Sequence, residues 1–158
     1  MKPAPQFTEL YTGPGFHFRV PPGWEVDEER QGDDFTVTVR PLDSSLTAFW
    51  SLTVMLGRPA PQTALRTILS AYEEEYAELD AYPVDEQVAG RQAVGRDLEF
   101  VCLELTNSAG VRVFRTRDFT GVVLYQSTDT EWEDCSPAFR LITGSLECGW
   151  EAGQEDDA

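Results

Sequence analysis

Two strand-like runs followed by one amphipathic segment, between Gly110 and Leu146, constrain the fold of this chain most strongly. The run VRVFRTRDFTGVVLYQS is rich in β-branched and aromatic residues, which favour strands. After it, apolar side chains recur at steps of three, four, three and four, at Trp132, Cys135, Phe139, Ile142 and Leu146. This spacing places them on one helical face, which a sheet or another helix must cover. The preceding hairpin is the nearest candidate.

Helix start signals divide this last segment and also mark an earlier helix. Thr130 and Glu133 form a capping-box pattern, and Ser136-Pro137 forms a second start signal. Because proline disrupts a continuous helix, we expect one turn over 131–135 and a main helix over 137–146. The other helix is expected over 62–79, where apolar residues again recur at helical spacing.

Alternating apolar and polar residues predict strands at 16–20 and 35–39, and a more central strand at 48–56. A short strand near 82–88 and a long one starting near Gln92 should follow, with a turn over 106–110. The resulting fold class is α+β: an α/β/α sandwich on a mostly antiparallel β-sheet, with two main helices at about 62–79 and 137–146. Residues 1–15 are expected to form an extended leader, 16–146 a single domain, and 147–158 an acidic, mobile tail.

The charge of the chain restricts its partners. It has 28 acidic and 12 basic residues, a formal net charge of −16. Such a surface repels phosphate groups, which argues against nucleic acid and anionic membranes as partners. No apolar run approaches the ~20 residues of a membrane span, and no signal peptide is visible, so a cytoplasmic location is expected. Monomer and homodimer both remain open.

The cysteine and histidine content indicates no catalytic site. Cys102, Cys135 and Cys148 are odd in number and lack CxxC spacing, which argues against a disulfide framework or thiolate metal site. Cys102 and Cys135 are interpreted as buried, and Cys148 as the most reactive thiol. His17 is the only histidine, and nothing places a nucleophile beside it. We therefore expect no enzyme, no catalytic residues and no cofactor; a hydrolase using His17 is the weakest hypothesis.

Charged clusters suggest pairing more than ligand binding. Asp33-Asp34 and the acids at 131, 133 and 134 could weakly hold Ca²⁺, but neither matches a calcium loop, so no metal is expected. Strand parity places Arg115 and Arg117 on one face and Arg112 on the other. These arginines are expected to pair with acids of the preceding strand, namely Asp97, Glu99 or Glu104.

Three motifs, in order, resemble the PsbP-like superfamily. They are F-x-F-x-V-P-P-G-W at Phe16 to Trp24, V-A-G-R-x-A at Val88 to Ala93, and S-P-A-F-x-x-I-x-x-S-L at Ser136 to Leu146. That superfamily includes the extrinsic PsbP protein of the oxygen-evolving photosystem, a Ran-binding import factor and bacterial chaperones of type VI secretion effectors. The resemblance implies an α/β/α sandwich in a non-enzymatic binding or assembly protein, and it transfers no functional residue.

Two functional hypotheses remain besides the hydrolase. The leading one is a non-catalytic protein-binding module, adaptor or chaperone-like, that uses an exposed sheet face or edge; its partner-binding residues are unknown. The alternative is a small-molecule or metal-binding domain with a pocket between the sheet and the long helix. Aromatic residues Trp50, Tyr72 and Tyr76 would line that pocket.

Overall fold

The computed structural model describes residues 8–149 as two helices and ten strands. In chain order these are β1 (Glu9–Gly13), β2 (Phe16–Val20), β3 (Trp24–Gln31), β4 (Asp34–Pro41), β5 (Phe49–Met55), α1 (Pro61–Glu75), β6 (Leu79–Val88), β7 (Arg91–Cys102), β8 (Leu105–Arg115), β9 (Thr120–Thr128), α2 (Asp129–Ser145) and β10 (Glu147–Cys148). Neither helix in this part of the chain is long and apolar enough to cross a membrane.

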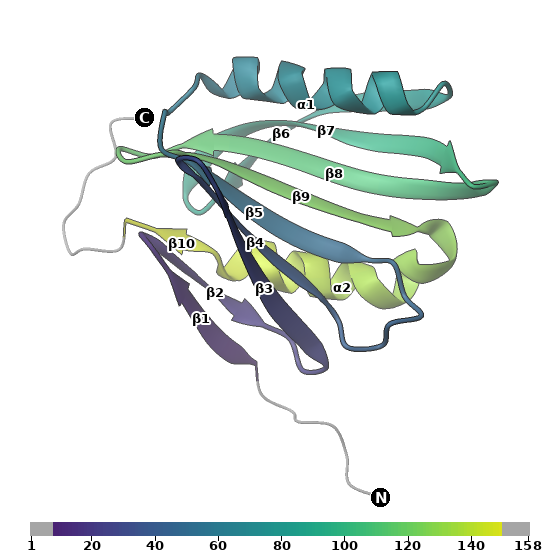
Figure 1. Ribbon diagram of the computed structural model, residues 1–158, viewed down its shortest axis with the longest axis horizontal. Coiled ribbons are helices and arrows are strands. Elements are labelled where there is room, and N and C mark those ends of the chain that lie inside the picture. The colour runs from purple at the N-terminus through teal and green to yellow at the C-terminus, as the bar shows by residue number, and fades with distance from the viewer. Residues whose placement is uncertain (1–7, 150–158) are drawn as a thin grey trace, which may run out of the picture.

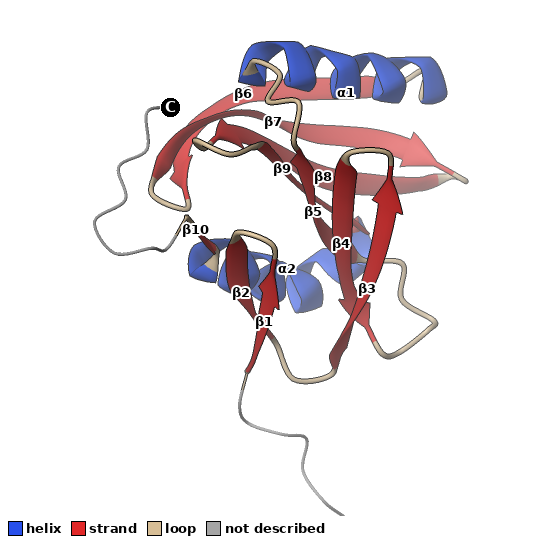
Figure 2. Ribbon diagram, turned by 60° about the vertical axis from the view of Figure 1, so that its left-hand side comes forward, coloured by secondary structure: helices blue, strands red, loops and turns tan. Residues whose placement is uncertain are grey.

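The strands form a large and a small antiparallel sheet. The large sheet has seven strands in the order β3-β4-β5-β9-β8-β7-β6, and the small one has the order β1-β2-β10. Helix α1 lies on one side of the large sheet, while α2 and the small sheet lie on the other (Figures 1 and 2). The α+β prediction with a mostly antiparallel sheet is therefore confirmed.

Apolar residues and threonines alternate along β4, and this explains why one face of this part of the sheet is partly exposed to solvent. Phe35, Val37 and Val39 are buried, while Thr36 is only partly buried on the opposite face. The hydroxyl oxygens of Thr36 and Thr53, on neighbouring strands, lie 2.9 Å apart. Helix α1 packs on β7 and β8 instead, so this threonine-rich face needs no cover.

The larger core lies between the large sheet, α2 and β2. Phe16, Phe18 and Trp50 are fully buried in it, with ring centroids of Phe18 and Trp50 4.9 Å apart. The indole Nε1 of Trp50 donates to the Thr143 hydroxyl of α2 at 2.9 Å. The small sheet thus encloses one side of the larger core.

Helix α1 ends four residues before the position that its periodicity predicts. The helix stops at Glu75, because Tyr76 leaves it to stack on Phe100 of β7 with ring centroids 4.3 Å apart. Leu79, expected as the last apolar residue of the helix, is instead the first residue of β6 and pairs with Phe100. The expectation of a helix over 62–79 was wrong at this end.

Helix α2 is continuous, contrary to the expected break at Ser136-Pro137. It runs from Asp129 to Ser145, with the Thr128 hydroxyl accepting from the Glu131 amide at its start. Pro137 lies inside the helix but on its exposed side, where water can satisfy the carbonyl that loses its partner. Burial of the apolar face stabilises the helix despite the proline.

The turn between β7 and β8 also differs from the expectation. The predicted turn residues 106–110 are part of β8; all of them pair with β7, and 107–110 also pair with β9. The chain turns at Leu103 and Glu104, which both have positive φ angles, of 54° and 67°. Leu103 is 90% exposed there. Neither residue favours this conformation, so composition gave no signal for the turn.

Both ends of the described chain belong to the small sheet. The expected leader contains β1, which pairs with β2 along its whole length, so the domain starts before residue 16. The expected tail contains β10, which pairs Glu147 with His17 and Cys148 with Phe16. The remaining parts of those two predictions, residues 1–7 and 150–158, lie outside the described residues.

Candidate functional site

Two adjoining cavities lie between α2 and the face of the large sheet opposite α1. We call the one of about 410 Å³ the inner cavity and the one of about 360 Å³ the outer cavity. Both are lined by Arg112, Tyr125 and Trp132. The inner cavity is also lined by Glu86 and Gln87 of β6 and by Ser136, Phe139, Arg140, Thr143 and Gly144 of α2. The outer cavity is also lined by Tyr82, Asp97, Leu98, Glu99, Ser108 and Ala109. We call these two cavities together the α2 groove.

Two glycines lie beneath residues that line the α2 groove. Gly110 lies beside Tyr125 in the sheet, and a Cβ added there would be 2.4 Å from Cζ of that ring. Gly95 lies beside Arg112, and an added Cβ would be 2.3 Å from the Val111 carbonyl oxygen. Because neither glycine has a side chain, the arginine and the tyrosine can lie against the sheet.

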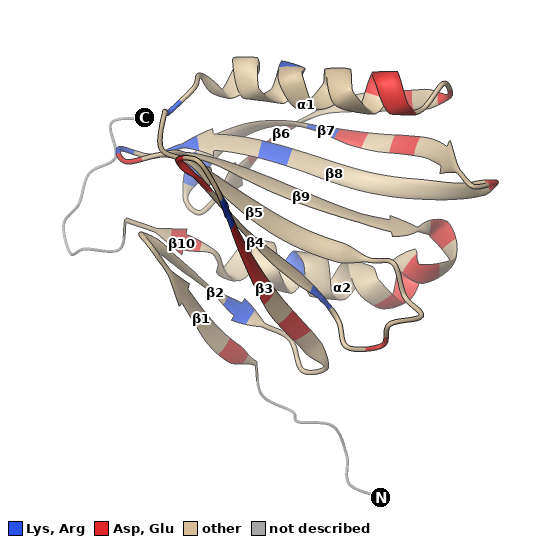
Figure 3. Cartoon of the chain, in the orientation of Figure 1, with Lys and Arg blue, Asp and Glu red and all other residues tan. Residues whose placement is uncertain are grey.

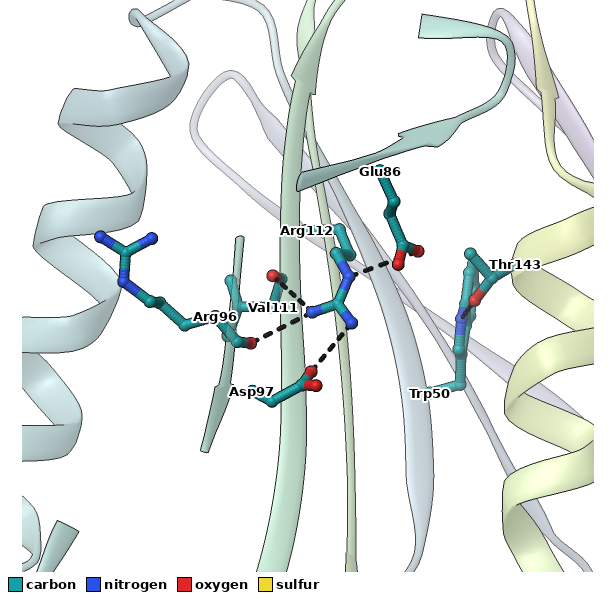
Figure 4. A network of polar contacts seen from close by, with 7 residues as sticks. All are labelled: Trp50, Glu86, Arg96, Asp97, Val111, Arg112 and Thr143. Carbon is teal, nitrogen blue, oxygen red and sulfur yellow. Dashed lines mark hydrogen bonds and ion pairs between the residues drawn. The ribbon is translucent and has the colours of Figure 1, made fainter. Parts of the chain in front are cut away.

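Arg112 is the central polar residue of the α2 groove. Its side chain is 5% exposed. One terminal nitrogen donates to the carbonyls of Arg96 and Val111, both at 3.1 Å, and the other donates to Asp97 Oδ1 at 2.8 Å (Figure 4). Its Nε lies 3.4 Å from Glu86 Oε2, but this contact is not aligned as a hydrogen bond. The guanidinium is thus held in place by β6, β7 and β8.

The parity argument is confirmed for Arg112 and Arg115, which lie on opposite faces of the sheet. Arg112 pairs with Asp97 of the preceding strand, as expected. Arg115 was expected to pair with an acid of that strand, but it donates to the Arg58 carbonyl at 2.9 Å. Arg117 lies beyond the end of β8, so strand parity does not apply to it.

Aromatic rings form the wall between the two cavities. Tyr125 stacks on Phe139 with centroids 5.0 Å apart, and Trp132 lies 6.4 Å from Tyr125. The Arg112 guanidinium carbon lies 5.9 Å from the Tyr125 ring centroid, within cation–π range. Burial raises the pKa of the Tyr125 hydroxyl, which stays protonated. The wall offers flat apolar surface next to charged groups.

Negative charge prevails in the outer cavity. Asp97 and Glu99 line it, and Arg112, the only cation among the described residues that line it, already bonds to Asp97. Figure 3 shows acidic residues grouped on β7 as well as on β3 and at the end of α1. The pKa of the Tyr82 hydroxyl is raised by the charge of Asp80 and then by that of Glu99, which reports the same negative potential.

His17 lies outside the α2 groove. It is on β2, where its Nε2 lies 3.2 Å from Glu147 Oε1 of β10. The histidine therefore links two strands of the small sheet, and the hydrolase hypothesis gains no support from its position.

The aromatic pocket expected on the long helix does not form as predicted. Tyr72 and Tyr76 line an open hollow of about 200 Å³ beside α1. Trp50 is fully buried in the core on the opposite side of the sheet. The three residues lie on different faces because Trp50 has the parity of Leu52 and Val54 on β5. Small-molecule pockets usually have ~300–1,000 Å³, and this hollow is smaller.

The two acidic clusters considered for Ca²⁺ lie at places where they have structural positions: one at the start of α2 and one in a hairpin. Glu131 accepts from the amide and the hydroxyl of Thr47, both at 3.0 Å, and so fastens the loop before β5 to α2. Asp33 and Asp34 lie in the β3–β4 hairpin. Within residues 8–149, no group of three or more His, Cys, Asp or Glu residues could hold a metal ion.

The most accessible thiol is not the one that we expected. Cys148 is buried, and burial raises the pKa of its thiol to about 12. Cys135 is also buried, with a raised pKa. Cys102, expected to be buried, is partly exposed. The prediction that Cys148 is the reactive thiol was therefore wrong.

We expect iodoacetamide at pH 8 to modify Cys102 first in the native protein and all three cysteines in denaturant. The thiolate is the reacting form, and the Cys148 thiol ionises only far above pH 8. Peptide mass spectrometry after a short pulse measures the order. Modification of Cys148 before Cys102 would show that β10 detaches from β2.

Sequence reasoning did not find the α2 groove. Its lining residues come from five elements, β6 to β9 and α2. The two glycines beneath it, Gly95 and Gly110, do not stand out in the sequence. The one available signal was Arg112, which has the parity of the α2 face. Gly110 was instead interpreted as part of a turn.

The two-sheet core and its two helices define an α+β sandwich. The chain adopts the PsbP-like fold. A solution structure of the cyanobacterial PsbP, CyanoP, from Synechocystis has a TM-score of 0.54 and 13% identity, covering 90% of this chain and 93% of that one. The crystal structure of LpqN from Mycobacterium tuberculosis, described as involved in cell envelope biogenesis, has a TM-score of 0.52 and 13% identity, covering 89% and 90%.

A longer structure is also similar. A crystal structure from Bacteroides thetaiotaomicron has a TM-score of 0.61 and 12% identity, covering 95% of this chain; this chain spans about half (51%) of that protein. No family model and no curated protein sequence matches the chain. At these identities the structural similarity defines the fold alone.

Proposed function

We propose that this protein is a non-catalytic protein-binding module, adaptor or chaperone-like, that holds a segment of another polypeptide in the α2 groove. The observation that carries the proposal is the α2 groove itself. Its two cavities adjoin, lie open between a helix and a sheet, and combine four aromatic residues with charged groups. Aromatic side chains and arginine are typical of protein-binding surfaces.

The sheet face supports this role better than the sheet edges do. Edge strand β6 contains Pro83, a residue that guards edges against the addition of another strand. The opposite edge, β3, has the sequence WEVDEERQ, whose acids repel most approaching strands. Of the two surfaces expected from the sequence, a sheet face or an edge, we therefore propose the face.

Site-specific cross-linking in the source organism tests the proposal. A photoreactive benzoylphenylalanine replaces Tyr82, which is 49% exposed in the outer cavity, or Arg66, which is exposed on α1. We expect the Tyr82 position to yield a covalent adduct with one recurrent partner polypeptide and the Arg66 position not to. The two positions share the same probe, so the comparison controls for its reactivity.

The proposal is overturned by three results. Equal adducts at both positions would indicate random collision, and no adduct at Tyr82 would exclude a polypeptide in the α2 groove. Adducts only with a second copy of this chain would indicate self-association in place of client binding.

A further inference from the structure

We infer that the α2 groove takes an arginine- or lysine-bearing segment of its partner, with the basic side chain in the outer cavity against Asp97 and Glu99. This inference rests on the proposed function and specifies its partner. It follows from two observations: the charge of the outer cavity and its aromatic wall.

The carboxylates of the outer cavity have capacity for a further cation. Asp97 uses Oδ1 to accept from Arg112, while its side chain remains 54% exposed. Glu99 is exposed and forms no ion pair within residues 8–149. Asp80, also exposed, lies on β6 opposite Glu99 in the sheet register. A cation in this cavity would thus meet Asp97 and Glu99 of β7, and Asp80 on the neighbouring strand would add negative charge beside them.

The aromatic wall suits the same ligand. Tyr82, Tyr125 and Trp132 all line the outer cavity. Ring faces attract ammonium and guanidinium groups, most strongly where water is excluded. The apolar stem of an arginine or lysine can also pack along such rings while its charged end reaches a carboxylate.

An anionic ligand fits this site less well. The terminal nitrogens of Arg112 are already engaged by Asp97 and two carbonyls. Arg140 lines the inner cavity and not the outer one. An anion in the outer cavity would therefore face Asp97 and Glu99 without a free cation to bind it.

Fluorescence anisotropy with the full chain tests the inference. The probes are a fluorescein-labelled Gly-Arg-Tyr repeat peptide and a matched peptide with citrulline in place of arginine, which keeps the shape and removes the charge. At about 150 mM salt, where long-range attraction is screened, we expect the citrulline peptide to bind about tenfold more weakly.

Charge-matched variants separate the α2 groove from general attraction by an acidic protein. The variant D80N/E99Q removes two charges at the outer cavity, and E73Q/E74Q removes two exposed charges on α1. We expect the first to weaken binding of the arginine peptide about fivefold and the second to change it less than about twofold. All four residues are exposed, so neither variant disturbs the core.

Three results would overturn the inference. These are equal binding of both peptides, equal weakening by both variants, and no binding of either peptide. Each would leave the proposed function standing if cross-linking at Tyr82 still identified a partner. The absence of that adduct together with charge-selective peptide binding would instead overturn the proposed function.

Discussion

Replacing Phe18 by alanine is expected to lower the free energy of unfolding by about 3–5 kcal/mol, the usual cost of removing a buried phenylalanine ring. Phe18 is fully buried, and its ring lies 4.9 Å from that of Trp50 and 5.1 Å from that of Tyr11. The substitution leaves a void between the small sheet and the large one that the rigid strands cannot close. Urea denaturation, monitored by tryptophan fluorescence, measures the loss in the free energy of unfolding.

A matched substitution on the neighbouring strand serves as the control. Leu10 is 53% exposed on β1, opposite Arg19 of β2. Leu10→Ala is expected to change the free energy of unfolding by less than about 0.5 kcal/mol, as exposed positions usually do. A loss below about 1 kcal/mol for Phe18→Ala would show that the small sheet does not form part of the core.

Replacing Arg112 by alanine is expected to destabilise the protein by about 2–4 kcal/mol, because the carbonyls of Arg96 and Val111 lose their charged donor and the groove floor loses its packing. The loss stays below that for a fully buried ion pair, since Glu86 and Asp97 are 44% and 54% exposed and stay hydrated.

Methionine at the same position separates packing from charge. Arg112→Met keeps an unbranched apolar stem, so we expect it to cost about half as much as Arg112→Ala. Denaturation of the three proteins under the same conditions gives the comparison. If Arg112→Met is as damaging as Arg112→Ala, the charged hydrogen bonds contribute nearly all the stabilisation; if both match the parent protein, Arg112 is not held as described.

The sheet could be predicted where a strand has one wet face. In β4, threonines alternate with Phe35, Val37 and Val39, and the buried positions are those the period of two implies. The apolar face of α2 was likewise predicted, because Cys135, Phe139 and Ile142 recur at helical spacing and are buried.

Predictions failed where a distant contact outweighed a local preference. The periodicity of α1 includes Tyr76, yet that ring leaves the helix for Phe100 of β7. Asn107 has turn chemistry, yet it is buried in β8, where it pairs with Thr128 of β9. Pro137 signals a helix start, but the buried face of α2 keeps the helix continuous. Each outcome depends on a partner that is remote in sequence.

The α2 groove could be predicted even less. Parity placed Arg112 on the correct face, but its burial depends on Gly95 of the neighbouring strand and on α2 beyond it. A groove is a property of the space between elements, and no single segment encodes that space.

The pairing of β10 with β2 bears on how the chain acquires its structure during synthesis. His17 lies opposite Glu147, and the Gly149 amide donates to the Gly15 carbonyl at 3.0 Å. Strand β2 thus acquires this neighbour only after every other element of the domain has left the ribosome, because β10 follows them all in the sequence. Contacts of such wide sequence separation form slowly, since a long loop must close first. The edge of β2 that β10 covers is therefore expected to stay unpaired until β10 emerges, and to be the edge that a ribosome-associated folding factor would shield.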